Sequence, residues 1–250
     1  MGRSVTEAIV EYAAPRPGMK VLDLASGTGE PGISLAKRVA PDGHVIAVDL
    51  SSELLEIAAG RARQRNLTNF QTRQADAHHL PFEDHVFDLA SCRFGVMFFS
   101  RVEEVLRELR RVLKPDARAC FVAWGPFEQP YWQSTMKIAH RHVGGTLLEP
   151  GGSDPFCFAE PGSLSDVLRG TGFHEVEEFS REVPWVWPGA ADEVFEYACS
   201  CSTPFKPMLA RAPEEKWPAI LADARAAIEQ YRVGNEIRFG AKVVMASGKA

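Results

Sequence analysis

Short apolar runs alternate with amphipathic segments through the first half of the chain. Five of these runs have strand length: 19–24, 44–49, 70–73, 86–91 and 117–124. Between them apolar residues recur at helical spacing, most regularly from Val102 to Leu113. Strands that alternate with helices are typical of a parallel sheet with helices on both faces. The pattern therefore predicts an α/β fold, to which runs at 173–179 and 239–246 add a sixth and a seventh strand.

Local signals predict where the helices begin. Pro31 lies near the first position of the helix after the first strand, where its missing N–H costs nothing. The serines after the second strand can cap a helix over 52–65. Ser100 and Glu103 have the spacing of a capping box ahead of the next helix. Ahead of the first strand, residues 6–14 can form one short helix.

Two segments interrupt the alternation, 125–160 and 184–232. Both are rich in aromatic residues, Pro and Gly, and all five tryptophans lie in or beside them. The chain shows neither an internal repeat nor a linker. We therefore expect a single domain over 1–250 that carries these two segments as insertions.

Charge argues against a nucleic-acid partner. The net charge is −5, whereas a surface that follows phosphates needs a basic patch. The densest basic runs, Arg61–Arg65 and Arg107–Lys114, are interleaved with apolar residues at helical spacing, as on solvated helix faces.

The five cysteines form no Cys-x-x-Cys pair and are irregularly spaced, so neither a zinc site nor a disulfide framework is expected. A reducing compartment follows from that usage. No apolar run approaches the roughly 20 residues that span a bilayer, and the N-terminus has no apolar signal core. We therefore expect a cytoplasmic protein without a membrane span.

The glycine-rich stretch DLASGTGEPG follows the first strand. A strand that turns sharply into a helix favours residues without a bulky Cβ, and the helix N-terminus then presents free N–H groups to a ligand. Gly27, Gly29 and Gly32 satisfy the dinucleotide fingerprint Gly-x-Gly-x-x-Gly. Asp49 lies 20 residues beyond Gly29, where a carboxylate can hold a ribose diol. These features fit NAD and S-adenosylmethionine (SAM) alike.

Two acidic residues favour SAM. Asp23, four residues before Gly27, would repel a pyrophosphate but suits the ammonium group of SAM. Asp76 follows the third strand, where it can accept a hydrogen bond from an adenine amino group. Because strand ends meet at one sheet edge, Asp23, Asp49 and Asp76 are expected to converge on one crevice. An NAD-dependent oxidoreductase and a SAM-binding protein that transfers no methyl group remain as alternatives.

Five blocks in order, VLDLASGTGEPG, VIAVDLS, QADAHHLPF, FDLASCRFGVMFF and LRELRRVLKPDARACFVAW, resemble the class I SAM-dependent methyltransferases. The resemblance is closest to the ubiquinone/menaquinone-biosynthesis C-methyltransferases. It covers residues 8–125 strongly, and 155–182 and 239–247 more loosely. It implies an enzyme with a Rossmann-like seven-stranded sheet of order 3-2-1-4-5-7-6, whose last strand is antiparallel.

The resemblance also implies a set of SAM contacts. Asp49 would hold the ribose hydroxyls, Leu50 would pack on the adenine, and Cys92 and Arg93 would border the sulfonium and the acceptor. The adenine edge would meet Asp76 and Ala77, and the methionine part would lie along Ala25, Ser26, Gly27 and Gly29. Ala25 replaces the family's first turn glycine, a change that is tolerated if φ there is negative.

Methyl transfer is an in-line displacement, so alignment of the reactants is the main requirement and no metal is expected. His140 and His142, in the first insertion, are candidates for a general base by location alone. Arg93 is a candidate for steering an acceptor oxygen. The sequence Ser-Cys-Arg-Phe at 91–94 replaces the Asn-Pro-Pro-Tyr type found in methyltransferases that act on amino groups of adenine or glutamine.

The acceptor is therefore expected to be a small, largely apolar or aromatic molecule such as a quinol, a phenol or a polyketide. The two insertions would form a cap over it. The candidate wall residues are aromatic: Phe94, Trp124, Phe127, Tyr131, Trp132, Phe156, Phe158, Trp185 and Trp187. Alternatively, these rings cover the sheet edge or build the face of a homodimer.

Overall fold

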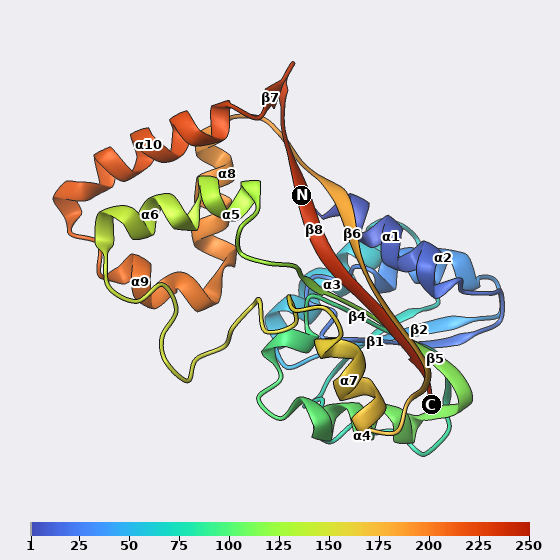
Figure 1. Cartoon of the computed structure of the whole chain (residues 1–250). Helices are drawn as coiled ribbons and strands as arrows, with labels where there is room; N and C mark the ends of the chain where they lie inside the picture. Colours follow the sequence, from blue (N-terminus) through green and yellow to red (C-terminus); the bar gives the residue numbers. More distant parts are fainter. Residues whose placement is uncertain (1) are drawn as a thin grey trace.

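A computed structural model describes residues 2–250. One sheet crosses the molecule in the order β3-β2-β1-β4-β5-β8-β6, and β7 pairs with β8 (Figure 1). The strands are β1 (Lys20–Leu24), β2 (His44–Asp49), β3 (Phe70–Gln74), β4 (Phe87–Arg93), β5 (Leu113–Trp124), β6 (His174–Pro188), β7 (Arg232–Val233) and β8 (Glu236–Lys249). Strands β1 to β5 are parallel, and β8 runs antiparallel to β5 and β6. The predicted order is confirmed, with the two-residue β7 as an additional strand, so that the predicted seventh strand is β8.

Helices cover both faces of this sheet, as predicted. On one face α1 (Arg3–Ala13) and α2 (Gly32–Val39) pack together, and α3 (Ser52–Gln64) packs on β2 and β3. On the opposite face α4 (Val102–Val112) packs against α7 (Ser163–Gly170) (Figure 1). Right-handed crossovers require this division, because the chain moves outward from β1 to β3 and then returns through β4.

The helix starts confirm one capping prediction and overturn another. Ser51 caps α3, since its Oγ accepts a hydrogen bond of 3.2 Å from Leu54 N. The capping box at Ser100 and Glu103 is wrong: α4 begins at Val102, and its N-cap residue Arg101 makes no side-chain capping bond. The short 3-10 helix η1 (Val96–Phe98) follows β4 and displaces the helix start, so Ser100 lies outside α4.

The two insertions supply most of a helical lobe. Its helices are α5 (Pro130–Ser134), α6 (Met136–Val143), α8 (Ala191–Cys201), α9 (Lys206–Ala210) and α10 (Trp217–Glu229), with the 3-10 turns η2 (Thr203–Phe205) and η3 (Glu214–Lys216). In Figure 1 this lobe lies to one side of the sheet, beside the far end of the β6–β8 ladder. Within residues 2–250, every helix is too short or too polar to cross a bilayer.

The second insertion begins later than predicted. Residues 184–188 continue β6 and stay paired with β8, from Pro184↔Gly240 to Pro188↔Glu236. Trp185 and Trp187 are therefore strand residues. Their aromatic side chains suit a long strand, but the flanking prolines at 184 and 188 gave the sequence the composition of a loop.

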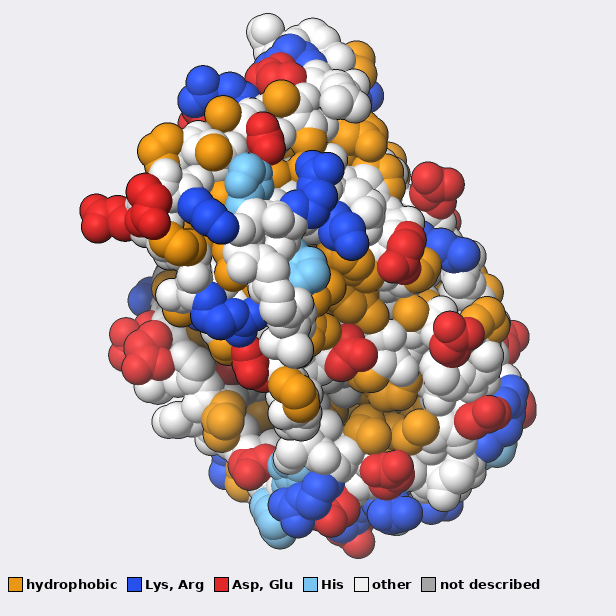
Figure 2. Space-filling model, turned by 60° about the vertical axis from the view of Figure 1, so that its left-hand side comes forward, with side chains coloured by type: hydrophobic (Ala, Val, Ile, Leu, Met, Phe, Trp, Pro, Cys, Tyr) orange, Lys and Arg blue, Asp and Glu red, His pale blue; other side chains and the backbone are white. Residues whose placement is uncertain are grey.

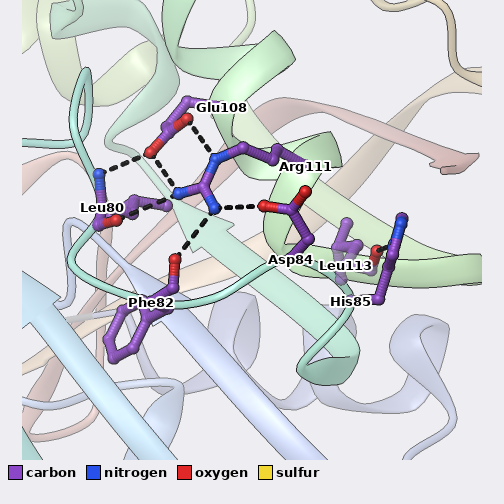
Figure 3. A network of polar contacts seen from close by, with 7 residues as sticks. All are labelled: Leu80, Phe82, Asp84, His85, Glu108, Arg111 and Leu113. Atoms are coloured by element: carbon purple, nitrogen blue, oxygen red, sulfur yellow. Dashed lines mark hydrogen bonds and ion pairs between the residues drawn. The ribbon is translucent and has the colours of Figure 1, made fainter.

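The connection from β3 to β4 contains no helix and is held in place by Arg111 of α4. Figure 3 shows its guanidinium group between Glu108 and Asp84. The guanidinium bonds both carboxylate oxygens of Glu108, at 2.7 and 2.8 Å, and Asp84 Oδ1 at 2.7 Å. It also donates to the carbonyl oxygens of Leu80 and Phe82. This network fixes a loop whose first residues reach the candidate site.

Candidate active site

A cavity of about 500 Å³ opens at the carboxyl ends of β1, β2, β3 and β4. Such a crevice is where α/β sheets bind their ligands. It is lined by Leu24, Ala25, Val48, Asp49, Leu50, Ala75, Asp76, Ala77, His78, Phe94, Gly95, Phe98, Phe99 and Ser100. The cavity thus brings together five of the predicted SAM contacts, Ala25, Asp49, Leu50, Asp76 and Ala77, with Phe94 from the predicted acceptor wall.

Asp49 is fixed at the cavity by two backbone hydrogen bonds. Its Oδ2 accepts from Gly27 N at 2.8 Å, and its Oδ1 accepts from Ser51 N at 3.0 Å. A carboxylate oxygen has a second lone pair, so both oxygens retain capacity for ligand hydroxyl groups. Next to it Leu50 is 70% exposed, an open apolar surface at the cavity wall.

Asp76 and His78 also line the cavity. Asp76 Oδ1 accepts from the backbone N–H of His78 at 2.9 Å and lies 2.6 Å from its Nδ1. These hydrogen bonds hold the pKa of Asp76 below its usual value. His78 was not predicted from the sequence as a cavity residue. The available signal was Asp76, because an Asp side chain often accepts a hydrogen bond from the backbone N–H two residues later and so forms a turn.

The turn residue Ala25 does not meet the condition under which alanine is readily tolerated in place of glycine. Its φ is +52°, in the left-handed region, and not negative. A side chain in that region costs about 1–2 kcal/mol. The methyl group also restricts its neighbour: a Cβ added to Gly95 would lie 2.5 Å from Ala25 Cβ and 2.8 Å from Cys92 Sγ. Ala25 and Cys92 together therefore leave no room for a side chain at position 95.

Asp23 lies beneath the turn and does not line the cavity. It is fully buried and accepts hydrogen bonds from Gly32 N at 2.9 Å and Ser91 Oγ at 2.7 Å. Burial raises the pKa of its carboxyl group to about 7, against the opposing effect of these two bonds. A Cβ on Gly32 would lie 2.7 Å from the carboxylate, so glycine permits the close approach. Asp23 thus joins the turn to β4, and of the three predicted acids only Asp49 and Asp76 reach the cavity.

Arg93 and Cys92 do not line this cavity either. Arg93 donates to Thr6 Oγ1 at 2.9 Å and to Gly2 O at 3.2 Å, so it anchors α1 to the end of β4. Burial lowers the pKa of its guanidinium group. Arg93 instead lines a separate polar cavity beyond the glycine turn, together with Thr28. Cys92 is buried, and burial raises the pKa of its thiol.

Other turn residues shape the backbone instead of the cavity wall. Gly27 and Gly29 adopt positive φ values of +53° and +106°. Ser26 N donates to Val48 O at 3.0 Å, and Gly29 N donates to Ser26 O at 2.9 Å. The Oγ of Ser26 is buried and finds no hydrogen-bond partner among residues 2–250.

The predicted acceptor-wall residues form a packed aromatic cluster. Trp124 lies 5.2 Å from Trp132 and 5.0 Å from Trp185 between ring centroids, and Tyr131 lies 4.8 Å from Trp132. A second group joins Phe127, Phe156 and Phe205, whereas Phe158 is buried separately and Trp187 packs on Tyr197. None of these rings lines the cavity.

Phe94 alone connects this cluster to the cavity. Its ring stacks on Trp124 at 4.5 Å, and its φ is +59°. A bulky residue in that conformation is a backbone outlier, and such outliers concentrate at functional sites.

The two candidate general bases lie in the helical lobe. His140 Nε2 lies 2.8 Å from Gly145 O, and His142 Nε2 lies 2.8 Å from Asp223 Oδ2, which joins α6 to α10. Neither histidine lines the cavity. Over residues 2–250, no group of three or more His, Cys, Asp or Glu side chains is arranged to hold a metal ion.

The fold and the cavity define a Rossmann-like domain built to bind a nucleoside-containing ligand. Residues 15–138 match the family model of a methyltransferase domain. This part of the chain therefore belongs to the methyltransferase-domain family, in line with the resemblance to the class I SAM-dependent methyltransferases.

Curated relatives and solved structures agree with this assignment. A demethylmenaquinone methyltransferase of Lactobacillus johnsonii is 37% identical over 49% of this chain and 52% of its own. A 2-phytyl-1,4-naphthoquinone methyltransferase of Synechococcus elongatus is 42% identical over 45% of this chain and 49% of its own. The chain thus spans about half the length of the curated relatives it matches.

Among solved structures, the YcgJ protein of Bacillus subtilis has the same fold, with a TM-score of 0.62 at 22% identity over 98% of this chain and 97% of its own. A SAM-dependent methyltransferase of Aquifex aeolicus gives a TM-score of 0.55 at 22% identity, over 71% of this chain and 83% of its own.

Proposed function

We propose that this chain binds SAM in the cavity at the strand ends and transfers its methyl group to a small, largely apolar ring compound. The observation that carries the proposal is the cavity wall itself, which combines the fixed carboxylate of Asp49 with the exposed side chain of Leu50. A carboxylate suits the hydroxyl groups of a ribose, and an exposed apolar side chain suits the face of an adenine. The alternative of an NAD enzyme is not favoured by the relatives, which are methyltransferases.

The residues present fit SAM. Asp49 would accept from the ribose hydroxyls, and Leu50 would cover one face of the adenine. Asp76 would accept from the adenine amino group. The methionine part would extend toward the glycine turn, where Ala25 lines the cavity.

SAM supplies a methyl group on a positively charged sulfur. In the transfer, a carbon or oxygen of the acceptor forms the new bond to the methyl carbon, and the carbon–sulfur bond breaks with its electron pair on sulfur. The acceptor then releases a proton. The contribution of the protein is alignment and exclusion of water, for which Phe94 is suited because its strained backbone holds a rigid ring between the cavity and the aromatic cluster.

The proposed acceptor is a quinol of the naphthoquinone type. The names of the two relatives given above support this class, and so does the largely apolar lining near Phe94, Phe98 and Phe99. We further propose that residues 1–250 act as one domain and bind no nucleic acid, in keeping with the net charge of −5. A homodimer is a separate proposal, which light scattering after gel filtration tests directly.

Isothermal titration with SAM and with NAD tests the cofactor. Wild-type protein should bind SAM and not NAD, and Asp49→Ala should weaken SAM at least about 100-fold, since two hydrogen bonds to a charged group contribute about 1.5–3 kcal/mol each. Asp42→Ala, at an exposed turn, is the matched control and should bind normally. Tighter binding of NAD, or an unchanged Asp49→Ala, would refute the assignment.

Incubation with methyl-labelled SAM and 1,4-naphthoquinol tests the reaction. Incorporation of label into the quinol is the expected result. Binding of SAM without labelling of any quinol or phenol would support the alternative of a SAM-binding protein that transfers no methyl group.

A further inference from the structure

A second cavity, of about 430 Å³, adjoins the first. Its walls come from three separate parts of the chain: Phe98 in η1, residues 149–153 ahead of α7, and residues 201–207 at the end of α8 and in η2 and α9. Phe98 lines both cavities, so the two meet at this side chain. In Figure 2, hydrophobic side chains gather in the middle of the face below the helical lobe.

Phe98 is open to solvent at the meeting point of the two cavities. It is 44% exposed, whereas Trp124, Tyr131, Trp132 and Trp185 of the aromatic cluster are buried. When a ligand covers an exposed apolar side chain of this size, the binding free energy becomes more favourable by about 25 cal/mol for each Å² of apolar surface removed from water. The packed cluster offers no such gain, because its rings already cover one another.

The lining of the second cavity identifies the chemistry of its occupant. Phe98, Pro204 and Pro207 provide rigid apolar surface, and Glu149 is the one charged lining residue. Arg211 lies 2.6 Å from Glu149 Oε1 and also donates to Thr146 O, so it neutralises and fixes this carboxylate. The free oxygen of Glu149 can still accept a hydrogen bond. The volume lies within the range of small-molecule pockets, about 300–1,000 Å³.

We infer that the second cavity holds the methyl acceptor, with Phe98 on the wall that acceptor and cofactor share and Glu149 as the acceptor of a ligand hydroxyl hydrogen bond. This inference rests on the proposed methyl transfer. The occupant is an uncharged molecule with a planar apolar ring and at least one hydroxyl group. The acceptor site is then built from the helical lobe and the segment ahead of α7, instead of from the tryptophan cluster.

Thr203→Trp tests the location, because Thr203 is an exposed lining residue and the indole would occupy the cavity. Lys206→Trp is the matched control: it is exposed, three residues away, and outside the lining. Kinetics with 1,4-naphthoquinol under anaerobic conditions should show at least a tenfold loss of kcat/KM for Thr203→Trp and less than a twofold loss for Lys206→Trp. The Kd for SAM should stay within threefold for both, and equal melting temperatures would exclude unfolding.

A binding measurement separates this inference from the proposed reaction. In the presence of S-adenosylhomocysteine, titration with 1,4-naphthoquinone should show binding to the wild type that Thr203→Trp weakens at least tenfold, whether or not methyl transfer is detected. Equal binding or kinetics in the two tryptophan variants, or no binding to the wild type, would overturn the acceptor site. Failure of methyl transfer with binding intact would overturn only the proposed reaction.

Glu149→Gln tests the polar contact. The amide keeps the size of the side chain but lacks the negative charge, so KM for the quinol should rise about fivefold, which corresponds to about 1 kcal/mol. The quinone has no hydroxyl to donate, and its Kd should stay within twofold. An equal effect on quinol and quinone would show that Glu149 supports only the local structure.

Discussion

The contact between Ala25 and Gly95 gives a quantitative test of the turn at the cofactor cavity. Carbon atoms in contact normally lie about 3.5–4.0 Å apart, but a methyl group added to Gly95 would lie 2.5 Å from Ala25 Cβ. Overpacking of this kind costs about 1–3 kcal/mol, so Gly95→Ala should lower the free energy of unfolding by about 2 kcal/mol. Ala25→Gly removes one of the two clashes and leaves the 2.8 Å approach to Cys92 Sγ.

The single variant Ala25→Gly should be nearly neutral. Relief of the left-handed strain gains about 1 kcal/mol, and the greater freedom of glycine in the unfolded chain costs about the same. In the double variant, the cost of the alanine at 95 should therefore fall to about 1 kcal/mol, which gives a coupling of about 1 kcal/mol.

Urea unfolding followed by circular dichroism measures all four proteins of this cycle. Gly170→Ala is the control, because a Cβ there meets no atom within 4 Å, and it should not be destabilised. If the two substitutions at 25 and 95 are additive within about 0.3–0.5 kcal/mol, the scatter of independent sites, Ala25 does not restrict the side chain at 95.

Two further predictions concern the supports of the site. Burial raises the pKa of Asp23 from its ordinary value of 3.8 to about 7 in the folded protein. The folded state therefore binds this proton more tightly than the unfolded state does. The stabilisation that results is complete below about pH 4 and is lost as the pH rises through 7. Between pH 5 and pH 8 the wild type should lose up to about 3 kcal/mol of unfolding free energy relative to Asp23→Asn, and parallel urea-unfolding profiles of the two proteins would contradict this. Arg111→Lys keeps the charge but not the forked geometry, so it should cost about 1–2 kcal/mol and weaken SAM several-fold by loosening the loop that carries Asp76. Arg110→Lys is its control. Equal SAM affinity in the two variants would show that the hydrogen bonds of Arg111 do not support the SAM site.

Periodic apolar runs were sufficient to predict an α/β fold with helices on both faces of a parallel sheet, because burial on both sides of a parallel strand constrains every position of that strand. The strand order followed from the resemblance to the class I SAM-dependent methyltransferases. The glycine turn and the acids at 49 and 76 likewise predicted where a nucleoside ligand meets the sheet, since the carboxyl ends of parallel strands share one edge. These inferences depend on local spacing and on topology, which a sequence contains.

Only the tertiary structure decided where individual side chains point. Asp23 lies beneath the turn and Arg93 bonds to α1, because each group is directed by neighbours far away in the chain, Ser91 and Thr6. Trp185 belongs to a strand because β8, some 50 residues later, pairs with it. The second cavity likewise arises from three segments that meet only in the folded chain. Contacts between distant segments leave no periodic signal, and for that reason the sequence could predict the sheet edge at which the first cavity opens but not the existence of the second.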